Sequence, residues 1–238
     1  GLTRHERFAM CSPFKAPLAV AVLVGADAGR FGLDGQVAFT QADILDHAPV
    51  VKANRKRGRL SMAELAEAAV EVSDNSAANL LLPMIGGPEG LTAFVRAHGD
   101  TVTRLDRTEP ALNENVEGDP RDTTSPAAMA SLISRLLFRD MKADSASRLM
   151  TWLNASTTGD KRIKAGLPPG WTSGSKTGSC GSAFNDVALV KAPSGEQYVL
   201  AIYLDRPTGD AKAAEAAIAQ AARAALDFVS KAQRTGLE

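Results

Sequence analysis

The most constraining feature of this sequence is a group of three strand-like segments in its last quarter. They cover residues 171–177, 186–191 and 197–204, and a hairpin turn, Pro193-Ser194-Gly195, joins the second to the third. A helical pattern of apolar residues follows at 213–229. We therefore expect an antiparallel meander followed by a long amphipathic helix.

Helical spacing of apolar residues dominates the rest of the chain. It follows Ser12 and recurs over residues 62–72, 77–85, 91–95 and 127–137. Pro88 and Pro126 lie where helices would begin, since proline is tolerated in the first turn. Residues 103–126 show no clear periodicity, and irregular segments of this length inside a compact domain are usually functional. The prediction is a helix-rich chain with one sheet and one functional loop.

Composition and charge exclude several classes of function. Of 238 residues 45% are apolar, which supports a packed globule. The 27 basic residues are balanced by 27 acidic ones, so we expect no nucleic-acid partner. The apolar run at residues 16–24 is too short to span a bilayer, so we expect no membrane partner. The three histidines lie far apart without metal-binding spacing, and we expect neither a metal nor another cofactor.

The two cysteines, Cys11 and Cys180, lie too far apart for a CxxC redox or zinc motif. Two buried thiols and one long-range disulfide both remain open, and the second would imply an oxidising compartment.

Three short motifs carry candidate chemistry. Ser12-Pro13-Phe14-Lys15 places a hydroxyl and an amine on one face of a helix, where a neutral amine can accept the hydroxyl proton. Ser73-Asp74-Asn75 precedes a helical pattern, and its simpler interpretation is an N-cap. Lys176-Thr177-Gly178 lies on a predicted strand, where the glycine would let a substrate approach closely. Each motif is weak alone, but the three in this order are typical of class A β-lactamases and penicillin-binding proteins.

Longer segments resemble class A serine β-lactamases. Residues 7–15 are similar to the nucleophile segment of that family and residues 104–113 to its ω loop, and the similarity continues through 118–124 and 162–171. The resemblance implies one catalytic domain over residues 1–238 with the α/β (α+β) two-lobed fold of serine β-lactamases and DD-peptidases. The helical lobe would cover residues 12–160, and the sheet lobe would cover 161–238 together with the N-terminal segment.

In that family an N-terminal helix and two strands come before the segment that matches this sequence. One of those strands pairs with the strand predicted here at residues 197–204, so we expect a free apolar edge there. Three explanations remain open: the elements precede this sequence, another chain supplies them, or the chain is a nonfunctional fragment.

The resemblance also implies the catalytic residues. Ser12 would be the nucleophile, Lys15 its neighbouring amine and Ser73 the relay of a proton to the leaving nitrogen. Glu109 and Asn113 would hold and activate the hydrolytic water, and penicillin-binding DD-peptidases lack this pair.

The substrate-binding and structural residues are carried over in the same way. Asn75 would hold the substrate amide, Lys176 and Thr177 would receive its carboxylate with Arg162 as the only arginine for that task, and His47 would lie at the cleft entrance. The oxyanion hole would be the backbone N–H groups of Ser12 and Ser179. Arg107 and Asp122 would close the ω loop by a salt bridge, and a Cys11–Cys180 disulfide would resemble the carbapenem-hydrolysing branch.

The predicted function is hydrolysis of the β-lactam amide bond of penicillins and cephalosporins, with carbapenems as a further hypothesis. The chain would confer β-lactam resistance as a monomer in the periplasm or outside the cell, its signal peptide lying outside this sequence. The alternatives are a penicillin-binding DD-peptidase and a β-lactam-binding module that acylates without turnover.

Overall fold

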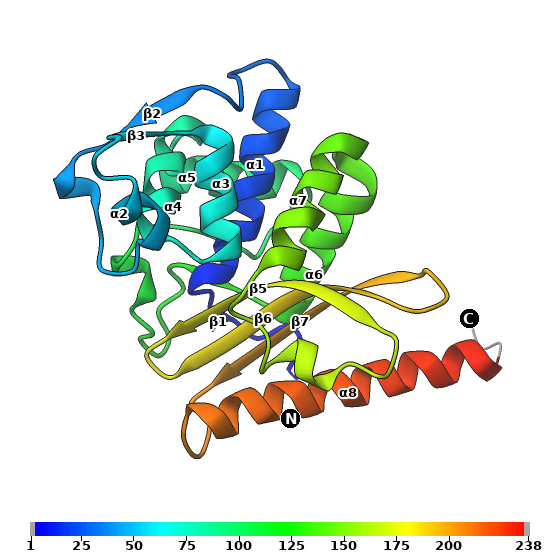
Figure 1. Ribbon diagram of the computed structural model, residues 1–238. Coiled ribbons are helices and arrows are strands. Elements are labelled where there is room, and N and C mark those ends of the chain that lie inside the picture. The colour runs from blue at the N-terminus through cyan, green and yellow to red at the C-terminus, as the bar shows by residue number, and fades with distance from the viewer. Residues whose placement is uncertain (1–2, 236–238) are drawn as a thin grey trace.

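The computed structural model describes residues 3–235, with helices on both faces of an antiparallel sheet (Figure 1). The strands are β5 (Thr172–Cys180), β6 (Ala183–Lys191) and β7 (Gln197–Asp205), and they are adjacent in that order. The predicted meander and the hairpin between the last two strands are confirmed, although each strand is longer than predicted. Among the described residues, β7 pairs with β6 alone.

Both faces of the sheet are buried. The helix α8 (Ala211–Thr235) covers one face, and α6 (Pro126–Arg135) and α7 (Ala143–Ala155) lie against the other (Figure 1). Successive residues of β6 alternate between the two faces, with Ala188 and Val190 in the core beneath α8 and Val187 in the main core. This explains why β6 reads as a continuous apolar run.

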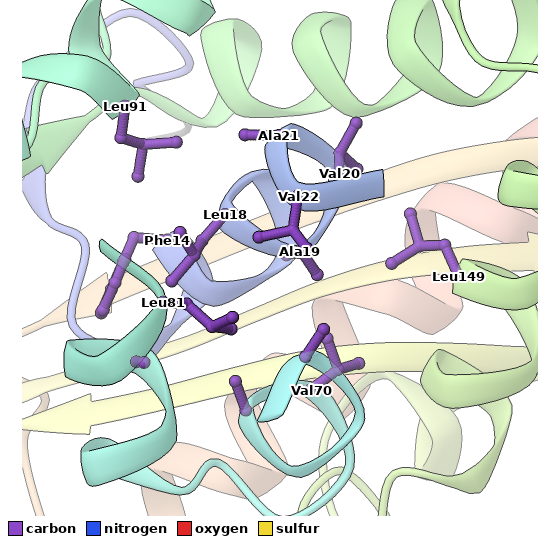
Figure 2. Close-up of a cluster of buried hydrophobic side chains, with 14 of the residues drawn as sticks. Phe14, Leu18, Ala19, Val20, Ala21, Val22, Val70, Leu81, Leu91 and Leu149 are labelled. Carbon is purple, nitrogen blue, oxygen red and sulfur yellow. The ribbon is translucent and has the colours of Figure 1, made fainter. Parts of the chain in front are cut away.

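The helix α1 (Lys15–Asp27) passes through the centre of the main core. Apart from Lys15 at its first position and Asp27 at its last, its side chains are apolar on all sides, and such a helix is stable only when it is buried. Figure 2 shows them surrounded by Val70, Leu81, Leu91 and Leu149. Those four residues belong respectively to α3 (Met62–Glu71), α4 (Asn75–Leu81), α5 (Gly87–Ala97) and α7. The N-terminal end of α1, which carries Lys15, is therefore fixed by packing.

The predicted helices over residues 62–72, 77–85, 91–95, 127–137 and 213–229 correspond to α3, α4, α5, α6 and α8, with shifted boundaries. Ser125 caps α6 by accepting a hydrogen bond from the Ala128 N–H at 3.2 Å, and Pro126 begins the helix as predicted. The prediction missed α7, although Leu149, Trp152 and Leu153 have helical spacing and are buried.

The described residues also form four short strands and one short α-helix. β1 (Phe8–Ala9) pairs with β4 (Thr123–Thr124), β2 (Gln36–Ala38) pairs with β3 (Arg59–Ser61), and α2 (Pro49–Ala53) lies between β2 and β3 in the sequence. The segment at residues 103–126 contains no α-helix up to Pro126, in agreement with the predicted loop. Within residues 3–235, every helix is too short or too polar to cross a lipid bilayer.

Candidate active site

The candidate nucleophile lies at the point where the chain enters the central helix. Ser12 begins a 3₁₀ turn, η1 (Ser12–Phe14), which leads directly into α1. The Lys15 Nζ atom lies 3.1 Å from Ser12 Oγ, so the three-residue spacing brings the amine and the hydroxyl together. Pro13 occupies the first turn, where its missing N–H leaves no hydrogen bond unmade.

The Lys15 amine is fully buried among oxygen atoms. Its Nζ lies 2.9 Å from Ser73 O, 2.5 Å from Asn75 Oδ1 and 3.0 Å from Glu109 Oε1. Burial lowers the pKa of Lys15, and the neighbouring Glu109 carboxylate opposes that shift. An amine with a lowered pKa in contact with a hydroxyl is suited to accept its proton.

The Ser73-Asp74-Asn75 corner is fixed by the aspartate. Asp74 caps α4 by accepting a hydrogen bond from Ala77 N at 2.9 Å, as the N-cap interpretation predicts. Its second oxygen accepts from the N–H groups of Val50 and Val51, at 2.9 and 3.0 Å, and so caps α2 as well. The flanking Ser73 and Asn75 side chains both reach Lys15. The capping and cleft-lining interpretations of this motif therefore coexist.

The Lys176 side chain on β5 approaches the same corner from the sheet. Its Nζ is fully buried and lies 3.0 Å from Ser73 Oγ and 2.8 Å from Thr177 O. Ser73 Oγ, which is also 3.3 Å from Lys15 Nζ, thus lies between two amines. Burial and then repulsion from Lys15 hold the pKa of Lys176 well below its usual value.

A threonine outside the predicted site residues supports the strand. Thr177 Oγ1 donates a hydrogen bond to Thr158 Oγ1 at 2.6 Å, which orients the Thr177 hydroxyl. Thr158 lies in the loop after α7 and belongs to none of the three motifs, so no pattern in the sequence could have identified it.

The candidate base lies on the irregular segment between α5 and α6. Asn113 Nδ2 donates to Glu109 Oε2 at 2.5 Å, while Glu109 Oε1 contacts Lys15. Asn79 holds the Glu109 backbone from both sides: its Oδ1 accepts from Glu109 N at 2.9 Å and its Nδ2 donates to Glu109 O at 2.8 Å. None of the three motifs predicts this role, although Asn79 follows Asn75 by one helical turn.

The ω loop, defined here as residues 107–122, is closed by an ion pair at its base. Arg107 Nε lies 2.5 Å from Asp122 Oδ2, as the resemblance implied. The other oxygen of Asp122 accepts hydrogen bonds from Asp106 N at 2.7 Å and from Arg107 N at 2.9 Å. Arg107 also pairs with Glu114 inside the loop. These contacts hold the two ends of the loop together.

The Arg162 guanidinium lies behind β5. Its Nη1 donates to Gly178 O at 2.8 Å and to Asn185 O at 2.7 Å, and its Nη2 donates to Ser179 Oγ at 2.6 Å. Glu215 of α8 contributes a carboxylate oxygen 3.8 Å from Arg162 Nε. The guanidinium therefore reaches the cleft through the Ser179 hydroxyl.

A disulfide between Cys11 and Cys180 joins the nucleophile segment to β5, with the two Cα atoms 5.7 Å apart. The expected pairing is confirmed. Gly178 packs directly against the nucleophile segment, since a Cβ atom there would lie 2.9 Å from Ser12 N. Only glycine allows this approach, which brings the strand carrying Ser179 close to Ser12.

These groups surround a cavity of about 250 Å³. It is lined by Ser12, His47, Ser73, Asn75, Asn113, Thr177, Gly178 and Ser179. The charged groups Lys15, Lys176 and Glu109 lie behind this lining and are buried. His47 is exposed at the edge, with its Nε2 atom 3.0 Å from Val72 O. Within residues 3–235, no cluster of His, Cys, Asp and Glu side chains is arranged to hold a metal ion.

A family model and the similar curated proteins both identify β-lactamases as relatives of this chain. Residues 1–229 match the model of the Beta-lactamase enzyme family. The chain is 43% identical over 226 residues to the carbapenem-hydrolyzing β-lactamase KPC of Klebsiella oxytoca, covering 94% of this chain and 77% of that protein. It is 40% identical to β-lactamase CTX-M-97 of Escherichia coli, covering 92% and 75%.

Solved structures agree with these relatives. The class A β-lactamase of the last common ancestor of Gram-negative bacteria superimposes with a TM-score of 0.92 and 47% sequence identity, covering 95% of this chain and 87% of that one. A likeness of this size extends to the whole arrangement of helices and sheet, and the predicted fold class is confirmed.

Proposed function

The chain belongs to the class A β-lactamase family, and from this membership we propose that it hydrolyses the amide bond of β-lactams through an acyl-enzyme on Ser12. The position of Lys15 Nζ carries the proposal: it lies 3.1 Å from Ser12 Oγ and 3.0 Å from Glu109 Oε1. One amine thus contacts both the group that must lose a proton in acylation and the carboxylate that must accept one in deacylation.

In acylation, Ser12 Oγ attacks the lactam carbonyl carbon and its proton passes to the Lys15 amine, with Glu109 as the adjacent carboxylate. The backbone N–H groups of Ser12 and Ser179 stabilise the oxyanion, and donors of this kind contribute roughly 3–4 kcal/mol each. When the carbon–nitrogen bond breaks, Ser73 Oγ donates a proton to the departing nitrogen. Ser73 regains a proton from Lys15, 3.3 Å away, so the proton that left Ser12 replaces the one given to the nitrogen.

In deacylation, Glu109 takes a proton from a water molecule, and the resulting hydroxide attacks the acyl carbon. The ester bond to Ser12 Oγ breaks, and the proton that Glu109 took from water passes through Lys15 to Ser12, which restores all three groups. The Asn113 amide, 2.5 Å from Glu109 Oε2, holds the carboxylate in the orientation that this step needs. Asn79 fixes the backbone beneath it.

The substrate carboxylate binds on the sheet side of the cleft. Thr177 and Ser179 supply hydroxyl groups at the cavity surface, and Lys176 supplies charge from behind them. Arg162 acts through the Ser179 hydroxyl, which it contacts at 2.6 Å. Asn75 and His47 contact the rest of the substrate from the helical side.

Carbapenems are proposed as substrates alongside penicillins and cephalosporins. Two findings support this: the disulfide next to the nucleophile, and 43% identity to a relative named as carbapenem-hydrolyzing. Repeated hydrolysis of imipenem is expected, and a stable acyl-enzyme without turnover would contradict it.

The disulfide also supports a periplasmic or secreted location, because such bonds persist in oxidising compartments. We propose a monomer, which gel filtration tests.

The decisive experiment is turnover of a chromogenic cephalosporin by the wild type and by Glu109→Ala. The wild type should release many products per protein, whereas the variant should release about one and retain an acyl adduct visible by mass spectrometry. Glu117→Ala is the matched control, since this carboxylate lies in the same loop but its side chain is 85% exposed. A single product from the wild type would instead indicate a DD-peptidase or a binding module, and rapid deacylation of Glu109→Ala would exclude the proposed base.

A further inference from the structure

The residue before the nucleophile has an unfavourable backbone conformation. Cys11 has φ 50° and ψ −144°, a combination that residues with a side chain rarely adopt. Such a conformation persists only where the surrounding contacts enforce it. Because the Ser12 N–H directly follows Cys11, the contacts that enforce it also aim one of the two proposed oxyanion donors.

One such contact is the Cys11–Cys180 disulfide, and a second comes from Asn185 on β6. Asn185 is fully buried, and its Nδ2 donates to Ala9 O at 2.9 Å and to Met10 O at 3.0 Å. The same nitrogen lies 3.7 Å from Cys11 Sγ. Both amide protons therefore hold the segment that leads into Cys11.

Asn185 is also connected to the strand that carries the other proposed donor. It is the register partner of Gly178 on β5, and its carbonyl oxygen accepts from Arg162 Nη1 at 2.7 Å. The same guanidinium nitrogen binds Gly178 O at 2.8 Å, one residue before Ser179. Asn185 thus links the segment that ends at Ser12 to the strand that presents Ser179.

We propose that Asn185 is a positioning residue that sets the separation of the two oxyanion-hole N–H groups, in parallel with the disulfide. Either restraint alone holds Cys11 in its unfavourable conformation, and loss of both releases it. Asn185 does not line the cavity, so it acts through Cys11 and Gly178. This inference rests on the proposed function, because it assumes that Ser12 and Ser179 stabilise an oxyanion.

The test compares the wild type, Asn185→Ala, Cys180→Ala and the double variant by cephalosporin turnover. Each single variant should lose about threefold in kcat. The double variant should lose at least about 100-fold, which approaches the effect of removing one oxyanion donor. KM should change by less than about threefold, since Lys176 and Thr177 are untouched. A double loss equal to the product of the single losses would overturn the proposal.

Two further measurements distinguish the proposed positioning role of Asn185 from a merely structural one. Thr92→Val is the matched control, because the Oγ1 atom of Thr92 in α5 makes two hydrogen bonds, each 2.9 Å, to the backbone of Leu105 in the following loop. It should lower Tm without changing kcat in the presence or absence of the disulfide. In acyl-enzymes trapped by Glu109→Ala, the ester carbonyl stretch should rise in frequency only when both restraints are removed. An unchanged stretch would contradict the proposal.

Two other outcomes, a variant that fails to fold and a wild type without turnover, can be told apart. Should Asn185→Ala fail to fold, Asn185→Asp keeps the shape while its carboxylate cannot donate, and the same non-additive loss is expected. Failure of the proposed function is recognised separately, because the wild type itself would then show no turnover. Normal wild-type turnover with independent single and double effects would overturn the role of Asn185 alone.

Discussion

The two buried lysines of the cleft have the same side chain but different surroundings. On the helical side, Lys15 contacts the Glu109 carboxylate at 3.0 Å. On the sheet side, Lys176 hydrogen-bonds to Ser73 Oγ and Thr177 O, and the carboxylates of Asp186 and Glu109 act on it only through longer-range attraction. Burial lowers the pKa of both lysines, and the pKa of Lys176 falls well below its usual value.

This difference suggests how the two sides divide the work. The charge of a buried cation in contact with a carboxylate is compensated even when no substrate is bound, and the cation can exchange protons with that carboxylate. A buried cation without such a contact gains most when an anion binds beside it. The helical side is therefore suited to proton transfer and the sheet side to binding the substrate carboxylate.

The largest effect is expected for Lys15→Met. The acylation rate should fall by up to about 10⁴-fold, because the Ser12 hydroxyl loses its proton acceptor. The free energy of unfolding should also fall, by about 3–5 kcal/mol, because the Glu109 carboxylate is left buried without its cation. Stopped-flow acylation with a chromogenic cephalosporin and urea unfolding at about pH 7 measure the two effects. Unchanged stability would contradict the idea that Lys15 and Glu109 balance each other.

Unlike Lys15→Met, Lys176→Met should weaken substrate binding without lowering the free energy of unfolding. We expect kcat/KM to fall by about 10²–10³-fold for substrates with the usual carboxylate, mainly through KM. The free energy of unfolding should stay the same or rise, since the change removes a buried charge that has no contacting carboxylate. A methyl ester of the same cephalosporin is the matched substrate, and it should lose much less. A stability loss equal to that of Lys15→Met would break the comparison.

Asp186 makes the free energy of unfolding depend on pH. Burial raises the pKa of Asp186 to about 6, from 3.8 for an exposed aspartate. Between these values the folded state keeps a proton that the unfolded state loses, so the free energy of unfolding falls as pH rises through this window. The difference between these two pKa values limits the effect on the free energy of unfolding to about 3 kcal/mol.

Asp186→Asn should remove this slope and keep an oxygen for the Ile163 N–H, which Asp186 Oδ2 accepts at 3.0 Å. Urea unfolding of both proteins from about pH 4 to about pH 7 should show the variant gaining stability relative to the wild type as pH rises. A constant difference across the range would show that Asp186 does not titrate in this window.

The fold was largely predictable because its strongest signals are periodic. Alternation and a hairpin turn identify the sheet, and apolar spacing identifies α3 to α6 and α8. The helix α7 was missed because its buried residues are diluted by exposed polar ones. The two-residue strands β1 and β4 could not be predicted, since their pairing joins segments more than a hundred residues apart.

The site was predictable where a motif carries the chemistry and unpredictable where a single side chain supports it. Asn79, Thr158 and Asn185 each act through hydrogen bonds to partners distant in the sequence. The position of Arg162 behind Ser179 also depends on how the strands of the sheet meet, which no local pattern encodes.

The smallest effect concerns Thr158, which orients the Thr177 hydroxyl at the cleft surface. Thr158→Val removes the acceptor for Thr177 Oγ1, 2.6 Å away, and so frees the Thr177 hydroxyl to rotate. Because one hydrogen bond contributes about 0.5–1.5 kcal/mol net, KM for a carboxylate substrate should rise by about threefold. Thr158→Ser keeps the hydroxyl and should restore the wild-type KM, while kcat stays constant in both variants. A fall in kcat instead would place Thr158 with the proton-transfer groups of the helical side. It would contradict the assignment of proton transfer to Lys15 and of carboxylate binding to Lys176.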